Sequence, residues 1–142
     1  MRFEATQGLQ AVQMQQFTKL KKNYETVCSG YDPVTGKQIY ADCVVGDVTY
    51  RMNAGRDAAE KMDGGVRIFE YQGSPVMPII RDFYNTNHIN LPLAVAMSIS
   101  VQQGVDALGH WVQYGQKVDA IKNAQTVQEV RDIPIDFIVN IL

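Results

Sequence analysis

Residues 88–123, HINLPLAVAMSISVQQGVDALGHWVQYGQKVDAIKN, contain the densest apolar run of the sequence and its single tryptophan. Apolar side chains between residues 90 and 103 point in nearly every direction around a helix axis, which is typical of a central, buried helix. Gly104 then predicts an end or a kink. Beyond it a one-sided apolar stripe predicts an amphipathic helix packed on the first. We expect the rest of the chain to wrap around these two segments.

Length and composition limit the classes of protein to consider. The chain has 142 residues with 46% hydrophobic residues and a net charge of -2, which fits a single domain over residues 1–142. Nucleic-acid binding needs a clear basic excess, so this balance argues against it. No run reaches the roughly 18 apolar residues of a membrane span, and residues 1–10 lack a signal-peptide core. We expect a protein that stays in the cytoplasm or is packaged from there into a particle.

The first part of the chain predicts a helix over residues 3–27. Its apolar residues follow the spacing of one helical stripe: Leu9, Val12, Phe17, Leu20 and Tyr24. Glutamines such as Gln10 and Gln13 stand where charged residues usually solvate the outer face. Because an amide is cheaper to desolvate than a charge, we interpret Gln10 and Gln13 as candidate interface residues. The alternative is that glutamine simply favours helix.

A change of pattern follows this helix. Residues 38–45 and 48–52 are rich in β-branched and aromatic residues, and Gly46-Asp47 between them is a hairpin signal. Together with the turn at residues 32–36, this predicts a small antiparallel β-meander near residues 29–52.

Glycine and proline mark the elements that come next. Asp63-Gly64-Gly65 predicts the end of a short helix over residues 56–62, and the alternation in residues 66–71 predicts a strand, with a helix as the alternative. Ser74-Pro75 is a helix-start signal for residues 76–84. Thr126 predicts the cap of a last short helix. The fold class is therefore α+β and mainly helical, with about five helices around the meander.

Residues 133–142, IPIDFIVNIL, are almost wholly apolar, whereas chain ends are usually solvated. We expect them to dock on their own core or on a neighbouring chain, and we favour a helix after Pro134 over a strand. If the partner is another chain, the candidate interface residues are Phe137, Ile138, Ile141 and Leu142.

Reactive side chains are scattered in the sequence. Cys28 and Cys43 are the only cysteines, and without a secretion signal two free thiols are favoured over a disulfide. His88 and His110 have no second ligand at metal spacing, so we predict neither a metal site nor a cofactor. The sequence also has no nucleophile elbow and no phosphate-binding glycine loop.

One glutamate suggests an enzymatic activity. Glu25 ends the first predicted helix just before the meander, in residues 23–36, NYETVCSGYDPVTG. A glutamate at a helix end beside a β-rich lobe resembles the architecture of small phage-type muramidases. The resemblance implies Glu25 as the general acid and Asp32, Asp42 or Asp47 as the second carboxylate. The glycine pair and the threonine-tyrosine-glycine signature of those families are absent.

Three functions follow from these observations, in descending order of support. The first is a non-enzymatic interaction or assembly protein, a subunit of a larger complex such as a phage or virion particle, with a protein partner or a second copy. The alternative is a peptidoglycan glycosidase that uses Glu25 and Asp32. The third, nucleic-acid binding through Lys19, Lys21 and Lys22, conflicts with the net charge.

Overall fold

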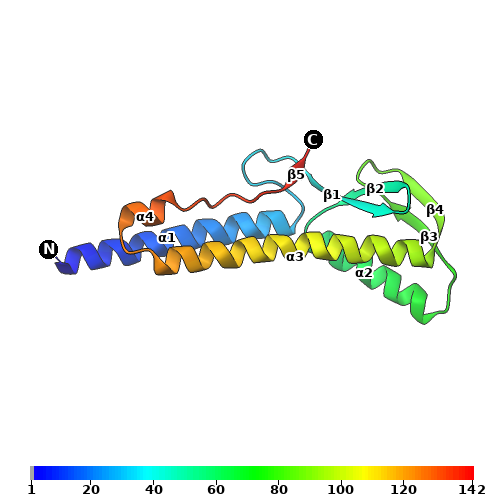
Figure 1. The fold of residues 1–142 in the computed structure, drawn as a ribbon, viewed down its shortest axis with the longest axis horizontal. Helices are drawn as coiled ribbons and strands as arrows, with labels where there is room; N and C mark the ends of the chain where they lie inside the picture. The colour runs from blue at the N-terminus through cyan, green and yellow to red at the C-terminus, as the bar shows by residue number, and fades with distance from the viewer. Residues whose placement is uncertain (1) are drawn as a thin grey trace.

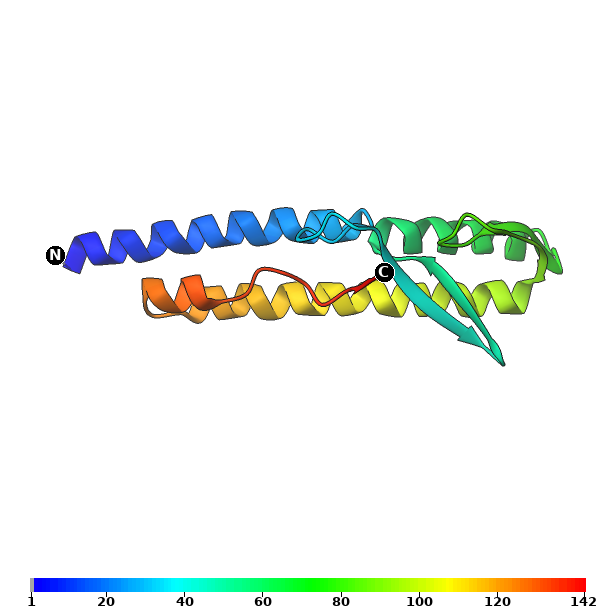
Figure 2. The same cartoon turned by 90° about the horizontal axis from the view of Figure 1, so that it is seen from above.

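A computed structural model describes residues 2–142 and shows an elongated molecule built along one long helix (Figure 1). This helix, α3 (Leu93–Asn123), has 31 residues and is therefore about 46 Å long. Two helices, α1 (Arg2–Cys28) and α2 (Arg56–Tyr71), lie one after the other along it (Figures 1 and 2). The α+β, mainly helical class is confirmed. The described part of the chain has four helices rather than about five.

The helix α3 runs through Gly104 without a break, so the prediction of two segments is wrong. Gly104 keeps a helical backbone, and its cost relative to alanine is only about 1 kcal/mol. Packing on α1, α2 and the first β-hairpin holds the helix straight along its length (Figure 2). The prediction that its first half is buried all round is also wrong, because Val101 is 65% exposed.

The predicted hairpin is confirmed. Strands β1 (Ile39–Val45) and β2 (Val48–Asn53) pair antiparallel across Gly46-Asp47, with Cys43 opposite Tyr50. The third strand comes from the other end of the chain: β5 (Asn140–Ile141) pairs with the start of β1. Residues 29–38 contribute one isolated bridge, Tyr31 to Gln38, so the meander is wrong in its first strand.

The helix α2 continues through Asp63-Gly64-Gly65, where the sequence predicted a stop and then a strand. Gly64 and Gly65 keep a helical backbone, and the buried Ala59 and Val66 lie on one side of the continuous helix. Gly65 also leaves room for Met77, whose methyl group lies 3.7 Å from where a Cβ on Gly65 would be. Burial of this face against α3 outweighs the low helix propensity of glycine.

Residues 74–92 form a hairpin rather than a helix, which corrects the prediction from Ser74-Pro75. Strands β3 (Val76–Arg81) and β4 (Asn87–Pro92) pair antiparallel. The Ser74 hydroxyl donates to the Val76 carbonyl at 2.7 Å, so it closes a turn instead of capping a helix. Asp82 shapes the hairpin loop, because its carboxylate accepts from the backbone N–H groups of Tyr84 and Thr86.

The last helix, α4 (Val127–Asp132), begins as predicted, with the Thr126 hydroxyl accepting from the Glu129 N–H at 3.1 Å. Residues 133–142, here called the tail, then run back extended along α1 and α3 to β5 (Figures 1 and 2). The predicted helix after Pro134 is therefore wrong. The tail closes a core that also holds Leu20, Val27 and Ile121.

A second core lies under the two hairpins, between α2 and the first half of α3, and includes Met77 and Ile99. Cys28 belongs to the first core and Cys43 to the second. Both are buried and free, as predicted.

Candidate functional site

The most prominent surface feature is an apolar face of α3 that no other element covers. Six of its large apolar side chains are between 38% and 65% exposed. With the exposed Gly104 they define what we call the α3 face: Met97, Val101, Gly104, Val105, Leu108, Trp111 and Val112. The opposite side of α3, which includes Ile99 and His110, is buried. The helix thus has a second apolar stripe that this chain itself does not use.

The α3 face carries no charge. Between residues 94 and 116 the only Asp, Glu, Lys or Arg is Asp106. Asp106 lies on the far side of the helix, where its carboxylate is 3.8 Å from the buried His110. An uncharged helical surface of 23 residues is about 34 Å long. Large exposed apolar patches of this kind mark interaction sites on folded proteins.

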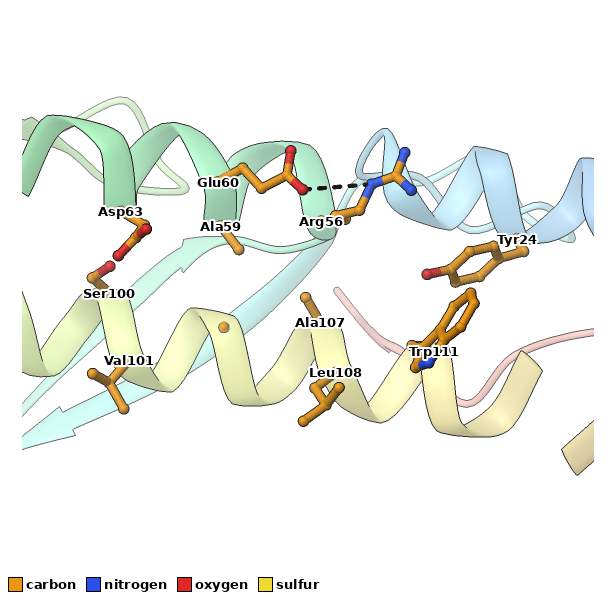
Figure 3. Close-up of a pocket in the computed structure, with 11 residues that line it drawn as sticks. Tyr24, Arg56, Ala59, Glu60, Asp63, Ser100, Val101, Ala107, Leu108 and Trp111 are labelled. Atoms are coloured by element: carbon orange, nitrogen blue, oxygen red, sulfur yellow. Dashed lines mark ion pairs between the residues drawn. The ribbon is translucent and has the colours of Figure 1, made fainter. Parts of the chain in front are cut away.

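A groove of about 460 Å³ adjoins the α3 face, between α3 and the junction of α1 and α2. Small residues form its middle: Figure 3 shows Ala59 and Ala107 directed toward each other across it. Tyr24 and Trp111 close one end, with ring centroids 5.9 Å apart (Figure 3). Val101 and Leu108, which project from α3 in Figure 3, belong to the α3 face and also line the groove, so the groove and the α3 face form one surface.

The rim of the groove has charges of both signs. Arg56 lies 3.7 Å from Asp57 and 4.0 Å from Glu60 on α2, so its charge is balanced locally. Tyr24 adds no charge, because burial and a hydrogen bond with Cys28 raise its pKa to about 12. The surface is therefore apolar along its middle and carries charges of both signs at its edge.

Glutamine has a role in this fold that the sequence did not reveal. The Gln102 amide accepts from the Val44 N–H at 2.7 Å and donates to the Val44 carbonyl at 2.8 Å. Gln113 makes the same pair of bonds with Ile138 in the tail, at 2.8 and 3.2 Å. Each side chain replaces a neighbouring strand, because it satisfies both backbone groups of an extended residue.

The predicted interface glutamines have different surroundings. Gln10 is exposed on α1, whereas Gln13 donates to the Ile121 carbonyl at 3.0 Å and so joins α1 to α3. Its neighbour Gln16 is buried and donates to the Ile133 carbonyl at 3.1 Å. Gln13 and Gln16 therefore hold α1 against α3 and the tail.

The apolar tail is docked on its own chain. Phe137 is 6% exposed and packs 5.9 Å from the Tyr24 ring, and Ile141 is half-buried in β5. Ile138 is 87% exposed and Leu142 is 61% exposed, so these two remain available to a partner.

The two proposed catalytic carboxylates lie in different environments. Glu25 is exposed on α1, whereas a glycosidase acid needs a partly apolar surrounding. Asp32 is 5% exposed, and its carboxylate accepts from the Thr35 hydroxyl at 2.7 Å and from the Thr35 N–H at 3.2 Å. Asp32 thus stabilises its own turn. The glycosidase interpretation stays a prediction without a geometric observation in its favour.

A buried polar cluster lies on the inner side of α3. Among the described residues, Gln103 Oε1, Asp106 Oδ2 and His110 Nδ1 are buried without a hydrogen-bond partner. Burial raises the pKa of Asp106 and lowers the pKa of His110, although each charge would offset part of the other's shift. Burial and the nearby Asp106 also raise the pKa of the Cys43 thiol to about 11. These surroundings therefore favour the uncharged forms of Asp106, His110 and Cys43.

Asp106→Asn should stabilise the fold at neutral pH by about 1 kcal/mol, because the amide removes a buried carboxylate. A raised pKa means that ionisation of Asp106 destabilises the folded state, and this cost grows as the pH rises from the ordinary carboxyl value to the raised pKa of Asp106. The gain should therefore shrink as the pH falls through the raised pKa of Asp106 and should be largely lost at about pH 3, below the ordinary value of an aspartate. Urea unfolding at the two pH values measures it. Asp119→Asn, at an exposed position of the same helix, should change little; an equal gain for Asp106→Asn at both pH values would contradict the explanation.

In comparisons with known proteins, no family model, curated protein or solved structure matches the chain. Within residues 2–142, no helix combines the length and the hydropathy needed to cross a membrane. The same residues contain no cluster of three His, Cys, Asp or Glu side chains that would hold a metal ion. The α3 face and its groove are therefore the features from which a function can be inferred.

Proposed function

We propose that this chain is a non-enzymatic assembly protein, a subunit of a larger complex, and that a helix of its protein partner packs on the α3 face. The observation that carries the proposal is the uncharged row of exposed apolar residues along α3. Phage and virion particles are examples of such complexes.

The energetics favour coverage of this surface. Burial of apolar area contributes about 25 cal/mol per Å². Val101, Val105, Leu108 and Trp111 are each more than half exposed in the isolated chain, so most of that gain is still available. Aromatic anchors such as Trp111 contribute strongly to binding when they are central to an interface.

The fold also holds the surface in a fixed shape. The other sides of α3 contact α1, α2 and β1, and Gln102 and Gln113 bind it to β1 and the tail. A partner therefore meets a preformed helix and loses little entropy in ordering it, which favours affinity.

Leu108→Glu should remove association, because it places a carboxylate in the middle of the apolar face. We expect the affinity to fall on the order of 100-fold, equivalent to about 3 kcal/mol. Sedimentation of the natively purified chain measures the mass of the particle that contains it, against 15.9 kDa for one chain.

Ile68→Glu is the matched control. Ile68 is 59% exposed on α2 and Leu108 is 58% exposed on α3, so the two changes differ in place rather than in exposure. We expect the wild type and Ile68→Glu to sediment above the mass of one chain, and Leu108→Glu to sediment as one chain. A wild type that stays at 15.9 kDa at every concentration would overturn the proposal.

A further inference from the structure

We infer that the occupant of the α3 face is the α3 face of a second copy of this chain, packed antiparallel about a twofold axis at Gly104. This inference rests on the proposed function and names its partner. It follows from the order of side-chain sizes along the face, the absence of charge and the length of the helix.

Two large apolar side chains of the α3 face lie at equal distances on either side of Gly104. Met97 precedes Gly104 by seven residues and Trp111 follows it by seven. An antiparallel pair related by a twofold axis at Gly104 therefore places Met97 of each copy beside Trp111 of the other. Thioether sulfur and an aromatic ring make a favourable contact. An isologous interface needs this kind of self-complementary pattern.

Large residues also meet small ones in this register. Leu108 comes opposite Ser100, which lines the groove and is 6% exposed, and Val101 comes opposite Ala107. Gly104 meets Gly104, and a Cβ added there would meet nothing within 4 Å beyond the adjacent backbone of α3 itself. Small residues at a crossing point let two helices approach closely, as ridges of one enter grooves of the other.

Charge permits two identical faces to meet. The only charged residue between residues 94 and 116, Asp106, lies on the far side of α3, so no like charges come together in the middle. On the groove rim, Arg56 and Glu60 of each copy supply both signs to the other. A polyanion or a polycation would find no matching charge on this surface.

The area suits a pair of long helices. A helix lying on α3 over 23 residues covers about 34 Å by 10 Å, roughly 350 Å² in projection on each copy. Contact with the second wall of the groove, formed by α2 and Tyr24, adds to this area, and a stable interface needs roughly 800 Å² per partner. A partner helix must therefore run for many turns, and α3 itself, with 31 residues, is long enough.

Disulfide formation tests the register directly. Gly104→Cys should give a covalent dimer under mild oxidation in most of the sample, because the two positions meet at the axis. Ala94→Cys, which is exposed on the same helix, should stay monomeric on denaturing gels, because an antiparallel pair places the two copies of residue 94 about 30 Å apart. The wild type is the background control, since Cys28 and Cys43 are 3% and 0% exposed.

The other outcomes separate this inference from the proposed function. Cross-linking of both variants would indicate a parallel pair and overturn the antiparallel register. A particle of two or more chains without Gly104→Cys cross-links would also overturn it, and the assembly function would stand. A particle of one chain plus a different protein would overturn only the inference that the occupant is a second copy. The proposed assembly function would then stand. A single chain at every concentration would overturn both proposals.

Discussion

Gly55→Ala should be the most damaging single substitution at a glycine of this chain, with an expected loss of at least about 4 kcal/mol in the free energy of unfolding. Gly55 joins β2 to α2 with φ +98° and ψ 158°, a conformation that is essentially restricted to glycine. An added Cβ would lie 2.6 Å from the Val27 carbonyl oxygen and 2.9 Å from that of Cys28. Both atoms are backbone at the end of α1, so they cannot move without disturbing the helix.

Gly64→Ala provides the contrast within the adjoining helix. Gly64 has a helical backbone in α2, and an added Cβ would meet no atom within 4 Å. Alanine should therefore stabilise the chain by about 0.5–1 kcal/mol. Urea unfolding of both variants measures the difference. Similar stabilities for the two would show that the close approach of Gly55 to α1 is not required.

Phe137→Ala should cost about 3–4 kcal/mol, the usual range for removal of a buried aromatic ring. Phe137 is 6% exposed, lies 5.9 Å from the Tyr24 ring and anchors the middle of the tail. Its loss leaves a cavity in the core that joins α1, α3 and the tail. Thermal or urea unfolding measures the cost.

Ile138→Ala, one residue further along the same extended segment, is the control. Ile138 is 87% exposed, so its truncation should change the stability by less than about 0.5 kcal/mol. Because Gln113 bonds to the backbone of Ile138, this variant keeps the tail in place. If both substitutions had the same small effect, the tail would not contribute to the core.

The sequence predicted the elements that have one clear local signal. The apolar stripe of α1, the Gly46-Asp47 turn and the Thr126 cap are examples, because each depends on residues close together in the chain. It failed where tertiary contacts decide between alternatives. Val66 and Phe69 fit a strand or a helix, and only the face offered by α3 makes the helical form of α2 the better one.

The hairpin of β3 and β4 illustrates the same limit. Ser74-Pro75 is a sound helix-start signal, yet Gly73 at φ +70° has just ended α2, and Asp82 orders a tight loop directly after β3. Met77 and Ile80 are buried three residues apart without a strict alternation, so the pairing of β3 with β4, rather than the pattern within β3, sets the strand over the second core. The tail is extended, where the sequence predicted a helix, for a related reason. Its extended form depends on hydrogen bonds with glutamine and asparagine side chains more than 20 residues away, such as Gln16, Asn23 and Gln113.

The candidate site was partly visible in the sequence. Val105, Leu108, Trp111 and Val112 were recognised as a stripe, but the stripe was placed against the core instead of in solvent. Periodicity shows that residues share a face and does not say what covers it. A second signal was available: the inner side of α3 has its own buried series, Ile99, Gln103 and His110, so the stripe of Val105, Leu108 and Trp111 had to lie on another side of the helix.

The fluorescence of Trp111 reports whether the α3 face is covered. Trp111 is the only tryptophan, is 55% exposed and lies on that face, so its emission depends on what packs there. At high concentration we expect wild-type emission to be shifted to the blue and protected from a soluble quencher, with both effects lost on dilution. Leu108→Glu should show the solvated signal throughout. Equal quenching of the wild type and Leu108→Glu at every concentration would contradict the proposal that a partner covers the α3 face.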